Sequence, residues 1–196
     1  KIPGRNYGIP QPMTEEDIMD VIDRFVFTAR IARETGFTGV QFHSAHGYLL
    51  SEFLSPDINT RSDAWGGSLE NRARIHLEII KRCRAEVGAD FPISVKLNSA
   101  DFQKGGFTAN ESIQVAKMLE DASVDIIEIS GGSYEQPKQI GADDLSINPD
   151  RSEERKESTI AREAYFLEYA NNIRKAVSLP LMVTGGFRTR DGIERA

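Results

Sequence analysis

Four short stretches of the chain alternate apolar and polar residues, and longer amphipathic stretches separate them. Alternation with a period of two residues is typical of a half-buried β-strand. The predicted strands are Gly39–His43, Ile93–Asn98, Asp125–Ser130 and Leu181–Thr184. Helical periodicity predicts helices over about 14–35, 49–54, 68–87, 109–122, 160–176 and 189–196. Because strands that alternate with helices form parallel sheets through crossover connections, this order predicts an α/β fold.

Each predicted strand has an apolar face and a more polar face. The residues of the polar face are Gln41, His43, Ser94, Lys96, Asn98, Glu128, Ser130, Met182 and Thr184. A doubly wound sheet is covered by helices on both faces and should be apolar on both. A polar second face near the carboxyl ends of the strands favours instead the interior of a (β/α)₈ TIM barrel, which opens on a functional site at that end.

The length predicts that this barrel is incomplete. A chain of 196 residues can bury the core of one domain, 1–196. A complete eight-stranded barrel takes about 250 residues. Because only about half of the strands are visible, we expect the chain to lack the N-terminal strands and the last strand of such a barrel.

Composition excludes several functional classes. The net charge of −6 argues against nucleic acid or an anionic membrane surface as a partner. No apolar run approaches the roughly 20 residues that span a bilayer, and Lys1–Gly4 does not begin a signal peptide. The single cysteine, Cys83, can form no internal disulfide, which suits a reducing cytoplasm. Cys83 lies within a helical pattern, so we expect it to pack in the core.

The segment Gly39-Val-Gln-Phe-His-Ser-Ala-His-Gly-Tyr48 joins the first strand to a polar loop. It places His43, His46 and Tyr48 at a strand end, where α/β barrels carry their chemistry. Two imidazoles can donate hydrogen bonds to a substrate oxygen, and a nearby tyrosine can deliver a proton. A metal site is less consistent with the sequence, because no carboxylate or cysteine is spaced to complete one. In the alternative interpretation, the histidines only satisfy backbone groups of the loop.

Lys96 is predicted to point into the barrel, where an ammonium group is costly unless an anion or an electron-rich group lies beside it. Two interpretations stay open. Lys96 either binds such a group from outside the chain, or it forms an internal ion pair with Glu128, which points inward from the next strand.

Glycine pairs follow the third and fourth predicted strands. Gly185 and Gly186 precede a predicted helix, which suits a phosphate held by backbone N–H groups. Ser130–Gly132 follows the third strand. Each glycine pair is a weak signal alone, since such pairs often form plain turns. Arg188, which follows Gly185 and Gly186, either pairs with a phosphate or lies solvated on the surface.

The loop Ser55–Arg72 is dense in turn-forming, capping and charged residues. Side chains of these types commonly hold a loop through bonds to its backbone. We therefore expect a scaffold role, rather than a chemical one, for Asn59, Arg61, Asp63, Glu70, Asn71 and Arg72.

Three motifs together resemble the Old Yellow Enzyme family of FMN-dependent NAD(P)H oxidoreductases, and the resemblance covers nearly the whole chain. They are Gly36-Phe-Thr-Gly-Val-Gln-Phe-His-Ser-Ala-His-Gly-Tyr48, Glu52-Phe-Leu-Ser-Pro56 and Asn59-x-Arg61-x-Asp63-x-x-Gly66-Gly-Ser-x-Glu-Asn-Arg72. The resemblance implies a (β/α)₈ barrel with FMN at its carboxyl-end mouth. It also implies that the visible strands correspond to the fourth to the seventh of that barrel.

The resemblance also implies roles for single residues. His43 and His46 match the pair that binds the activating oxygen of the substrate, and Tyr48 matches the proton donor. Lys96 matches a basic residue beside the flavin N1 and C2 carbonyl, where the family usually has arginine; lysine keeps the charge but loses the two-pronged geometry of the guanidinium. Gly185 and Gly186 match the first part of the FMN phosphate site. Ser130 and Gly131 are further predicted flavin contacts.

The function implied is reduction of the C=C bond of α,β-unsaturated carbonyl compounds, with NADH or NADPH as the electron donor and FMN as the carrier. The expected partners are a small-molecule enone or enoyl substrate and a second copy of the chain in a homo-oligomer. The competing hypothesis is a catalytically silent, flavin-free barrel fragment that self-associates. A phosphate-binding aldolase accounts less well for the sequence, because Lys96 lacks an accompanying Schiff-base motif.

Overall fold

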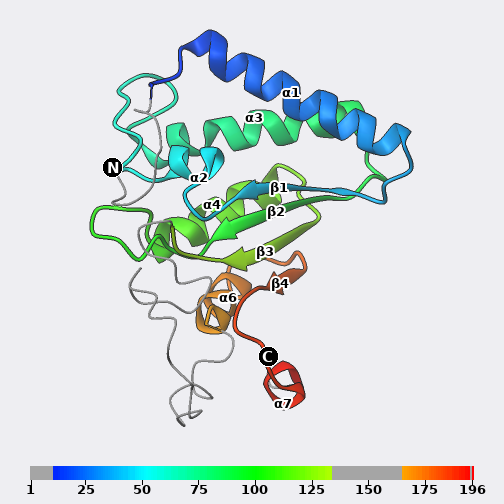
Figure 1. Cartoon of the computed structure of the whole chain (residues 1–196), viewed down its shortest axis with the longest axis vertical. Coiled ribbons are helices and arrows are strands. Elements are labelled where there is room, and N and C mark those ends of the chain that lie inside the picture. Colours follow the sequence, from blue (N-terminus) through cyan, green and yellow to red (C-terminus); the bar gives the residue numbers. More distant parts are fainter. Residues whose placement is uncertain (1–10, 134–164, 195) are drawn as a thin grey trace, which may run out of the picture.

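The computed structural model describes residues 11–133, 165–194 and 196. Its elements, shown in Figure 1, are α1 (Glu15–Glu34), β1 (Val40–Ser44), α2 (Leu49–Leu54), α3 (Leu69–Val87), β2 (Ile93–Asn98), α4 (Ala109–Asp121), β3 (Ile126–Ser130), α6 (Leu167–Arg174), β4 (Leu181–Val183) and α7 (Arg190–Glu194).

The described strands form one parallel sheet in the order β1-β2-β3-β4. In its register, His43 lies opposite Lys96, and Lys96 lies opposite Glu128. Parallel pairing brings the carboxyl ends of the strands to one edge of the sheet, where the arrowheads of β1, β2 and β3 point in Figure 1. The predicted α/β architecture is thereby confirmed.

β2 has the predicted bounds, and each strand end that differs from its prediction is displaced by one residue. β1 begins at Val40 because the Val40 N–H is the first to pair, with the Pro92 carbonyl at 3.0 Å. At Gly39 the backbone comes so close to the segment before β2 that a Cβ on residue 39 would lie 2.9 Å from the Pro92 carbonyl oxygen. Beyond the end of β4, the Thr184 N–H still donates to the Ile129 carbonyl at 2.9 Å. The pairing therefore continues one hydrogen bond past Val183.

Side-chain caps start α1, α3 and α4. Thr14 and Asp17 form a capping box at the start of α1, in which each side chain accepts from the backbone N–H of the other residue. Ser68 caps α3, and Thr108 forms a second capping box ahead of α4. These caps satisfy N–H groups that have no partner within their own helix.

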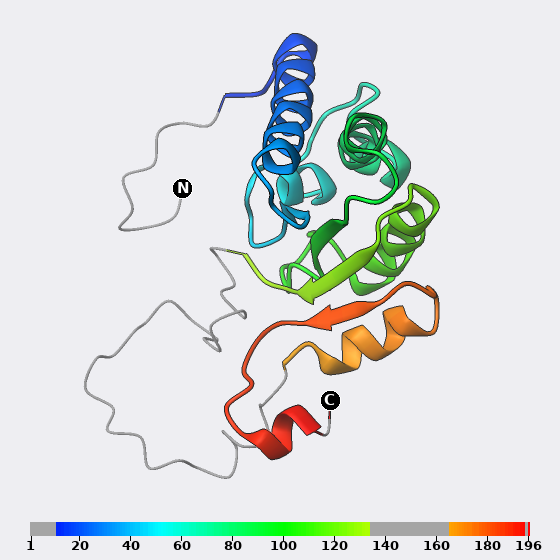
Figure 2. The same cartoon turned by 90° about the vertical axis from the view of Figure 1, so that its right-hand side faces the viewer.

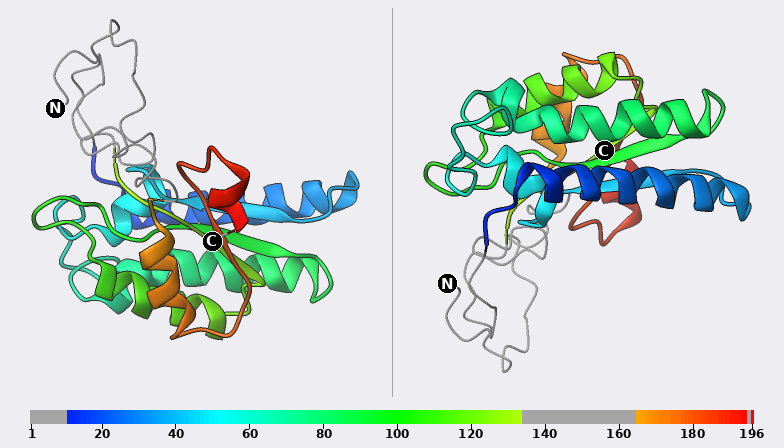
Figure 3. Two further views of the ribbon diagram at one scale, coloured as in Figure 1. Left: turned by 90° about the horizontal axis from the view of Figure 1, so that it is seen from below. Right: turned by 90° about the horizontal axis from the view of Figure 1, so that it is seen from above.

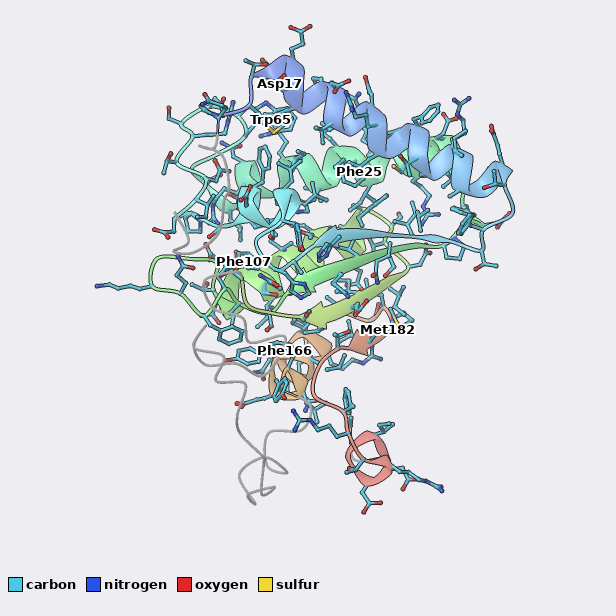
Figure 4. All side chains as sticks on the ribbon, in the orientation of Figure 1. Asp17, Phe25, Trp65, Phe107, Phe166 and Met182 are labelled. Carbon is cyan, nitrogen blue, oxygen red and sulfur yellow. The ribbon has the colours of Figure 1, made fainter. Side chains whose placement is uncertain are left out.

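The hydrophobic core lies between the sheet and helices on one side of it. Figure 2 shows α3, α4 and α6 along that side, and Figure 3 shows α1 beside α3. Phe25 of α1 meets Phe42 of β1 edge to face, with 5.6 Å between the ring centroids (Figure 4). The buried strand residues on this face are Phe42, Ile93, Val95, Leu97, Ile127 and Ile129. They are residues of the face predicted to be apolar.

The opposite face of the sheet carries the polar residues predicted to point inward. Met182, labelled in Figure 4, is 40% exposed on this face. Cys83 of α3 is fully buried, as predicted, and burial raises the pKa of its thiol to about 12. The thiol is therefore protonated and packs as an apolar group.

Two predicted helices are shorter in the structure. α6 begins at Leu167 and α7 runs only from Arg190 to Glu194. The start of the predicted helix at Ile160 and most of the predicted loop 131–158 lie outside the described residues. Within the described part of the chain, no helix is both long and apolar enough to cross a bilayer.

Candidate functional site

The site lies where β1 leaves the sheet. His43 is on β1, His46 follows in the connecting loop, and Tyr48 is the N-cap residue of α2. The ring centroids of His43 and His46 lie 5.2 Å apart, and those of His43 and Tyr48 lie 4.9 Å apart. The structure thus brings together the three side chains that the sequence assigned to catalysis.

His46 is held at both its backbone and its ring. Its φ of 66° lies in the left-handed region, which a non-glycine residue rarely adopts. The His46 backbone N–H donates to Oδ1 of Asn98 at 3.1 Å, and its Nε2 lies 2.7 Å from Oγ of Ser130. The contacts come from the ends of β2 and β3, so neighbouring strands hold the loop in this strained conformation.

Asn98 connects three strand ends. Besides accepting from His46, its amide nitrogen donates to Oδ1 of Asp101 at 3.0 Å and to the Gly132 carbonyl at 2.9 Å. The side chain is 1% exposed, so these bonds form away from water. The sequence placed Asn98 on the inward face and gave it no role; the last inward position of a strand is the signal that could have singled it out.

Both site histidines are biased toward the neutral form. Loss of hydration lowers the pKa of His43, Lys96 lowers it further, and Glu128 opposes the shift. Burial lowers the pKa of His46 to about 4, with added repulsion from His43 and Lys96. A neutral imidazole carries one N–H donor and one acceptor nitrogen. Each ring can therefore donate one hydrogen bond near pH 7.

Lys96 forms the internal ion pair that the sequence left open, with its Nζ 3.1 Å from Oε1 of Glu128. Glu128 also accepts from Nε2 of Gln41 at 2.8 Å and from the Thr184 hydroxyl. Hydrogen bonds from Thr184, Gln41 and Lys96 together lower the pKa of the Glu128 carboxyl against its desolvation. Glu128 is therefore ionised, and its carboxylate links the side chains of Lys96, Gln41 and Thr184 on the inner face of the sheet.

The glycine turns pack against aromatic rings. A Cβ at Gly131 would lie 2.7 Å from Phe166 and 2.8 Å from Phe102, and one at Gly186 would lie 2.7 Å from Tyr165. Gly185 and Gly186 both have left-handed φ values, 113° and 76°. Ring packing and backbone conformation thus each require glycine here, independently of any phosphate. α7 begins at Arg190, so the pair does not lie in its first turn.

The loop between α2 and α3 has the scaffold role predicted for it. The Asn59 amide donates to the Phe53 and Trp65 carbonyls, both at 2.8 Å. Arg61 binds the Met13 carbonyl and forms an ion pair with Asp63. Arg72, 4% exposed, binds the Leu54 carbonyl and pairs with Glu111 of α4.

A buried contact that the sequence did not reveal supports the start of the loop. The Oγ of Ser44, the last residue of β1, lies 2.6 Å from Nε2 of His76 on α3. Burial lowers the pKa of His76 to about 4, so its ring is neutral near pH 7. Ser44 and His76 lie 32 residues apart, so the local sequence of neither one indicates the contact.

A protein-family comparison matches residues 4–194 to the NADH:flavin oxidoreductase / NADH oxidase family. The chain belongs to this family. It is 40% identical over 191 residues to the NADH-dependent flavin oxidoreductase iliE of Neonectria sp., covering 96% of this chain and 24% of that protein. It is 37% identical over 186 residues to an NADH oxidase of Thermoanaerobacter brockii, covering 95% of this chain and 26% of the relative. The chain spans less than half the length of these relatives.

Solved structures give the same family and the fold. A 2-naphthoyl-CoA reductase in complex with 2-naphthoyl-CoA superposes with a TM-score of 0.84 at 37% identity, covering 99% of this chain and 27% of that one. The old yellow enzyme homologue of Zymomonas mobilis has a TM-score of 0.71 at 25% identity, with 98% and 48% covered. The predicted resemblance to the Old Yellow Enzyme family and the incomplete TIM barrel are both confirmed.

The donor groups present fit a flavin. Lys96 supplies a cation at the mouth, where an electron-rich ring edge gains from a positive charge. The Lys96 side chain is 23% exposed. The register places Lys96 opposite His43, and Asn98 follows two residues later on the same strand. A flavin at Lys96 would therefore lie next to the imidazoles. The glycine turns add no independent support, since their own packing explains them.

Proposed function

We propose that these residues form the central part of an FMN-dependent oxidoreductase that uses NADH or NADPH to reduce the C=C bond of α,β-unsaturated carbonyl compounds. The remaining strands of the barrel belong outside this chain. The observation that carries the proposal is the convergence of His43, His46 and Tyr48 at a strand end beside Lys96. The names of the relatives support a nicotinamide-dependent flavin reaction.

His43 and His46 would bind the carbonyl oxygen of the substrate. Both rings are neutral near pH 7, so each offers a single N–H to an oxygen that gains negative charge as the alkene accepts hydride. Their centroid separation of 5.2 Å lets two donors reach one oxygen placed between them. Because both imidazoles are neutral, the charged groups beside them are Lys96 and its ion-pair partner Glu128.

Tyr48 would deliver the proton to the α-carbon. Its ring lies 4.9 Å from that of His43 by centroid distance and is 46% exposed, so its hydroxyl can exchange protons with solvent. FMN, when bound, supplies hydride transfer between the nicotinamide and the β-carbon. Lys96, Gly131, Gly185 and Gly186 are the proposed flavin contacts, of which Lys96 has the best physical support. Ser130 was predicted as a further contact, but its hydroxyl bonds the ring of His46 instead.

We further infer a cytoplasmic location, because the single cysteine can form no internal disulfide. The competing proposal is a flavin-free fragment that self-associates. It draws on the two outer strands, β1 and β4, whose outer edges have no partner among the described strands. The colour of the purified protein separates the two, since a bound flavin is yellow.

The experiment uses the full-length protein loaded with FMN. Replacing both His43 and His46 with alanine should abolish binding of phenol and turnover of cyclohexenone, while FMN stays bound. Each lost donor costs about 3 kcal/mol in the transition state. Lys81→Ala, at an exposed position of α3, is the control. Undiminished enone turnover in the double variant would contradict the proposal.

A further inference from the structure

We propose that Ser130 is a positioning residue that fixes the tautomer of His46, so that the Nδ1–H of His46 faces the substrate oxygen. The inference rests on the proposed function and deepens it. It also gives Ser130 a role different from flavin binding: the side chain acts through His46.

Contacts restrict His46 to one orientation. Its Nε2 lies 2.7 Å from Oγ of Ser130, and its backbone N–H donates to Asn98. The backbone at His46, in the loop after β1, has a left-handed φ of 66° and so departs from the extended conformation of the strand. Among the described residues, Nδ1 of His46 has no hydrogen-bond partner. Nδ1 is therefore the ring atom left for a ligand.

The hydrogen bond between Ser130 and His46 has two possible directions. In the first, the serine hydroxyl donates to Nε2, and the ring proton resides on Nδ1. In the second, Nε2–H donates to the serine oxygen, and Nδ1 presents a lone pair. The second arrangement would repel a carbonyl oxygen, so only the first serves substrate binding.

Burial favours the first direction. Ser130 is 0% exposed, and its hydroxyl has no other hydrogen-bond partner among the described residues. In the second arrangement its hydrogen would be buried without an acceptor, which is costly. In the first arrangement that hydrogen binds Nε2, and the proton of the neutral ring lies on Nδ1. The lowered pKa of His46 is consistent with a single ring proton.

The test compares Ser130→Ala with Ser130→Thr in the full-length protein loaded with FMN. Ser99→Ala is the matched control, because Ser99 is also a buried serine at a strand end and its Oγ has no hydrogen-bond partner among the described residues. Three quantities are measured for each: the dissociation constant of phenol, the dissociation constant of FMN, and the protonation of the two His46 nitrogens by ¹⁵N NMR.

We expect the unsubstituted protein to carry the His46 proton on Nδ1. Ser130→Ala should mix the two tautomers and weaken phenol binding about tenfold, the worth of roughly one hydrogen bond. The FMN dissociation constant should not change. Ser130→Thr should restore both phenol binding and the tautomer, and Ser99→Ala should leave all three quantities as they are.

Two results would overturn the inference. One is a proton on Nε2 of His46 in the unsubstituted protein. The other is weaker FMN binding in Ser130→Ala with unchanged phenol binding, which would make Ser130 a flavin ligand. Failure of the proposed function looks different: the unsubstituted protein would then bind neither phenol nor enone, whichever His46 nitrogen carries the proton.

Discussion

The ammonium of Lys96 lies 3.1 Å from Oε1 of Glu128, directly across the β2–β3 pair. Because Glu128 also accepts from Gln41 on β1 and from Thr184 after β4, one carboxylate joins all four described strands. The pair therefore stabilises the inner face of the sheet and also sets the net charge beside the histidines. Glu128 opposes the effect of Lys96 on the pKa of both His43 and His46.

Glu128→Gln should raise the midpoint potential of FMN in the full-length protein. Without the carboxylate, the Lys96 charge is no longer compensated, and it stabilises the electron-rich reduced flavin more strongly. A shift of about 30 mV corresponds to a tenfold change in the two-electron equilibrium. Potentiometric titration measures it, and Glu78→Gln, at a half-buried carboxylate on α3 that pairs with Arg82, is the control. An unchanged potential would place the flavin away from Lys96.

Tyr48→Phe should slow alkene reduction by about 10²–10⁴-fold, the usual worth of a placed proton donor. Reduction of FMN by NADH or NADPH should proceed at nearly the original rate, since that step needs no proton on the substrate carbon. Stopped-flow measurement of the two half-reactions separates them. Tyr169→Phe, on α6, is the matched control. Equal slowing of both half-reactions would give Tyr48 a structural role.

Acid should destabilise the protein through His76. Its folded-state pKa of about 4 lies below the ordinary value of 6.5, so the unfolded chain binds more protons between these two pH values. Stability is thus fully present above pH 6.5 and falls as the pH drops toward 4, by up to about 1.4 kcal/mol per pH unit. The shift of His46 acts in the same direction.

Urea unfolding at pH 7, 6 and 5 measures this dependence. His76→Gln should remove the contribution of one histidine from the slope. Ser44→Ala should lower stability at every pH, because the hydrogen bond to His76 is lost, but should keep the slope. A slope that His76→Gln leaves unaltered would show that the pKa of His76 is the same in the folded and the unfolded protein.

The 196-residue chain by itself should bind little FMN and should self-associate. Four parallel strands leave the outer edges of β1 and β4 without described partners, and no described strand faces the inner side of the sheet. Losing three hydrogen bonds to the flavin, each worth about 1 kcal/mol, weakens binding by roughly two decades. Flavin absorbance and light scattering on one sample measure both properties. A monomer with stoichiometric FMN would contradict the expectation.

The sequence predicted the sheet well, because the strands have alternating patterns that belong to each strand alone. Ile93, Val95 and Leu97 are buried against helices, as their period of two required. The capping box of Thr14 was equally visible, since its partner Asp17 lies three residues away. Local chemistry of this kind can be predicted from neighbours in the chain.

The contacts that shape the site could not be predicted in this way. Asn98 and Ser130 reach His46 from 52 and 84 residues away, and nothing in their local sequence indicates that partner. The same holds for Ser44 and His76, which lie 32 residues apart. Lys96 is an intermediate case. The strand pattern predicted that Lys96 points inward, but the pattern left its partner open, and only the strand register shows that Glu128 lies opposite it.

The spatial order of the strands equals their order in the sequence, β1-β2-β3-β4. Each described strand after β1 can therefore pair with a strand that has already left the ribosome, and none must wait for a later one. Synthesis at about 5–20 residues per second gives each unit time to dock before the next emerges. The sheet can thus grow from its first strand as the chain is made, and the loop carrying His43 and His46 acquires its supports in sequence, first Asn98 and then Ser130.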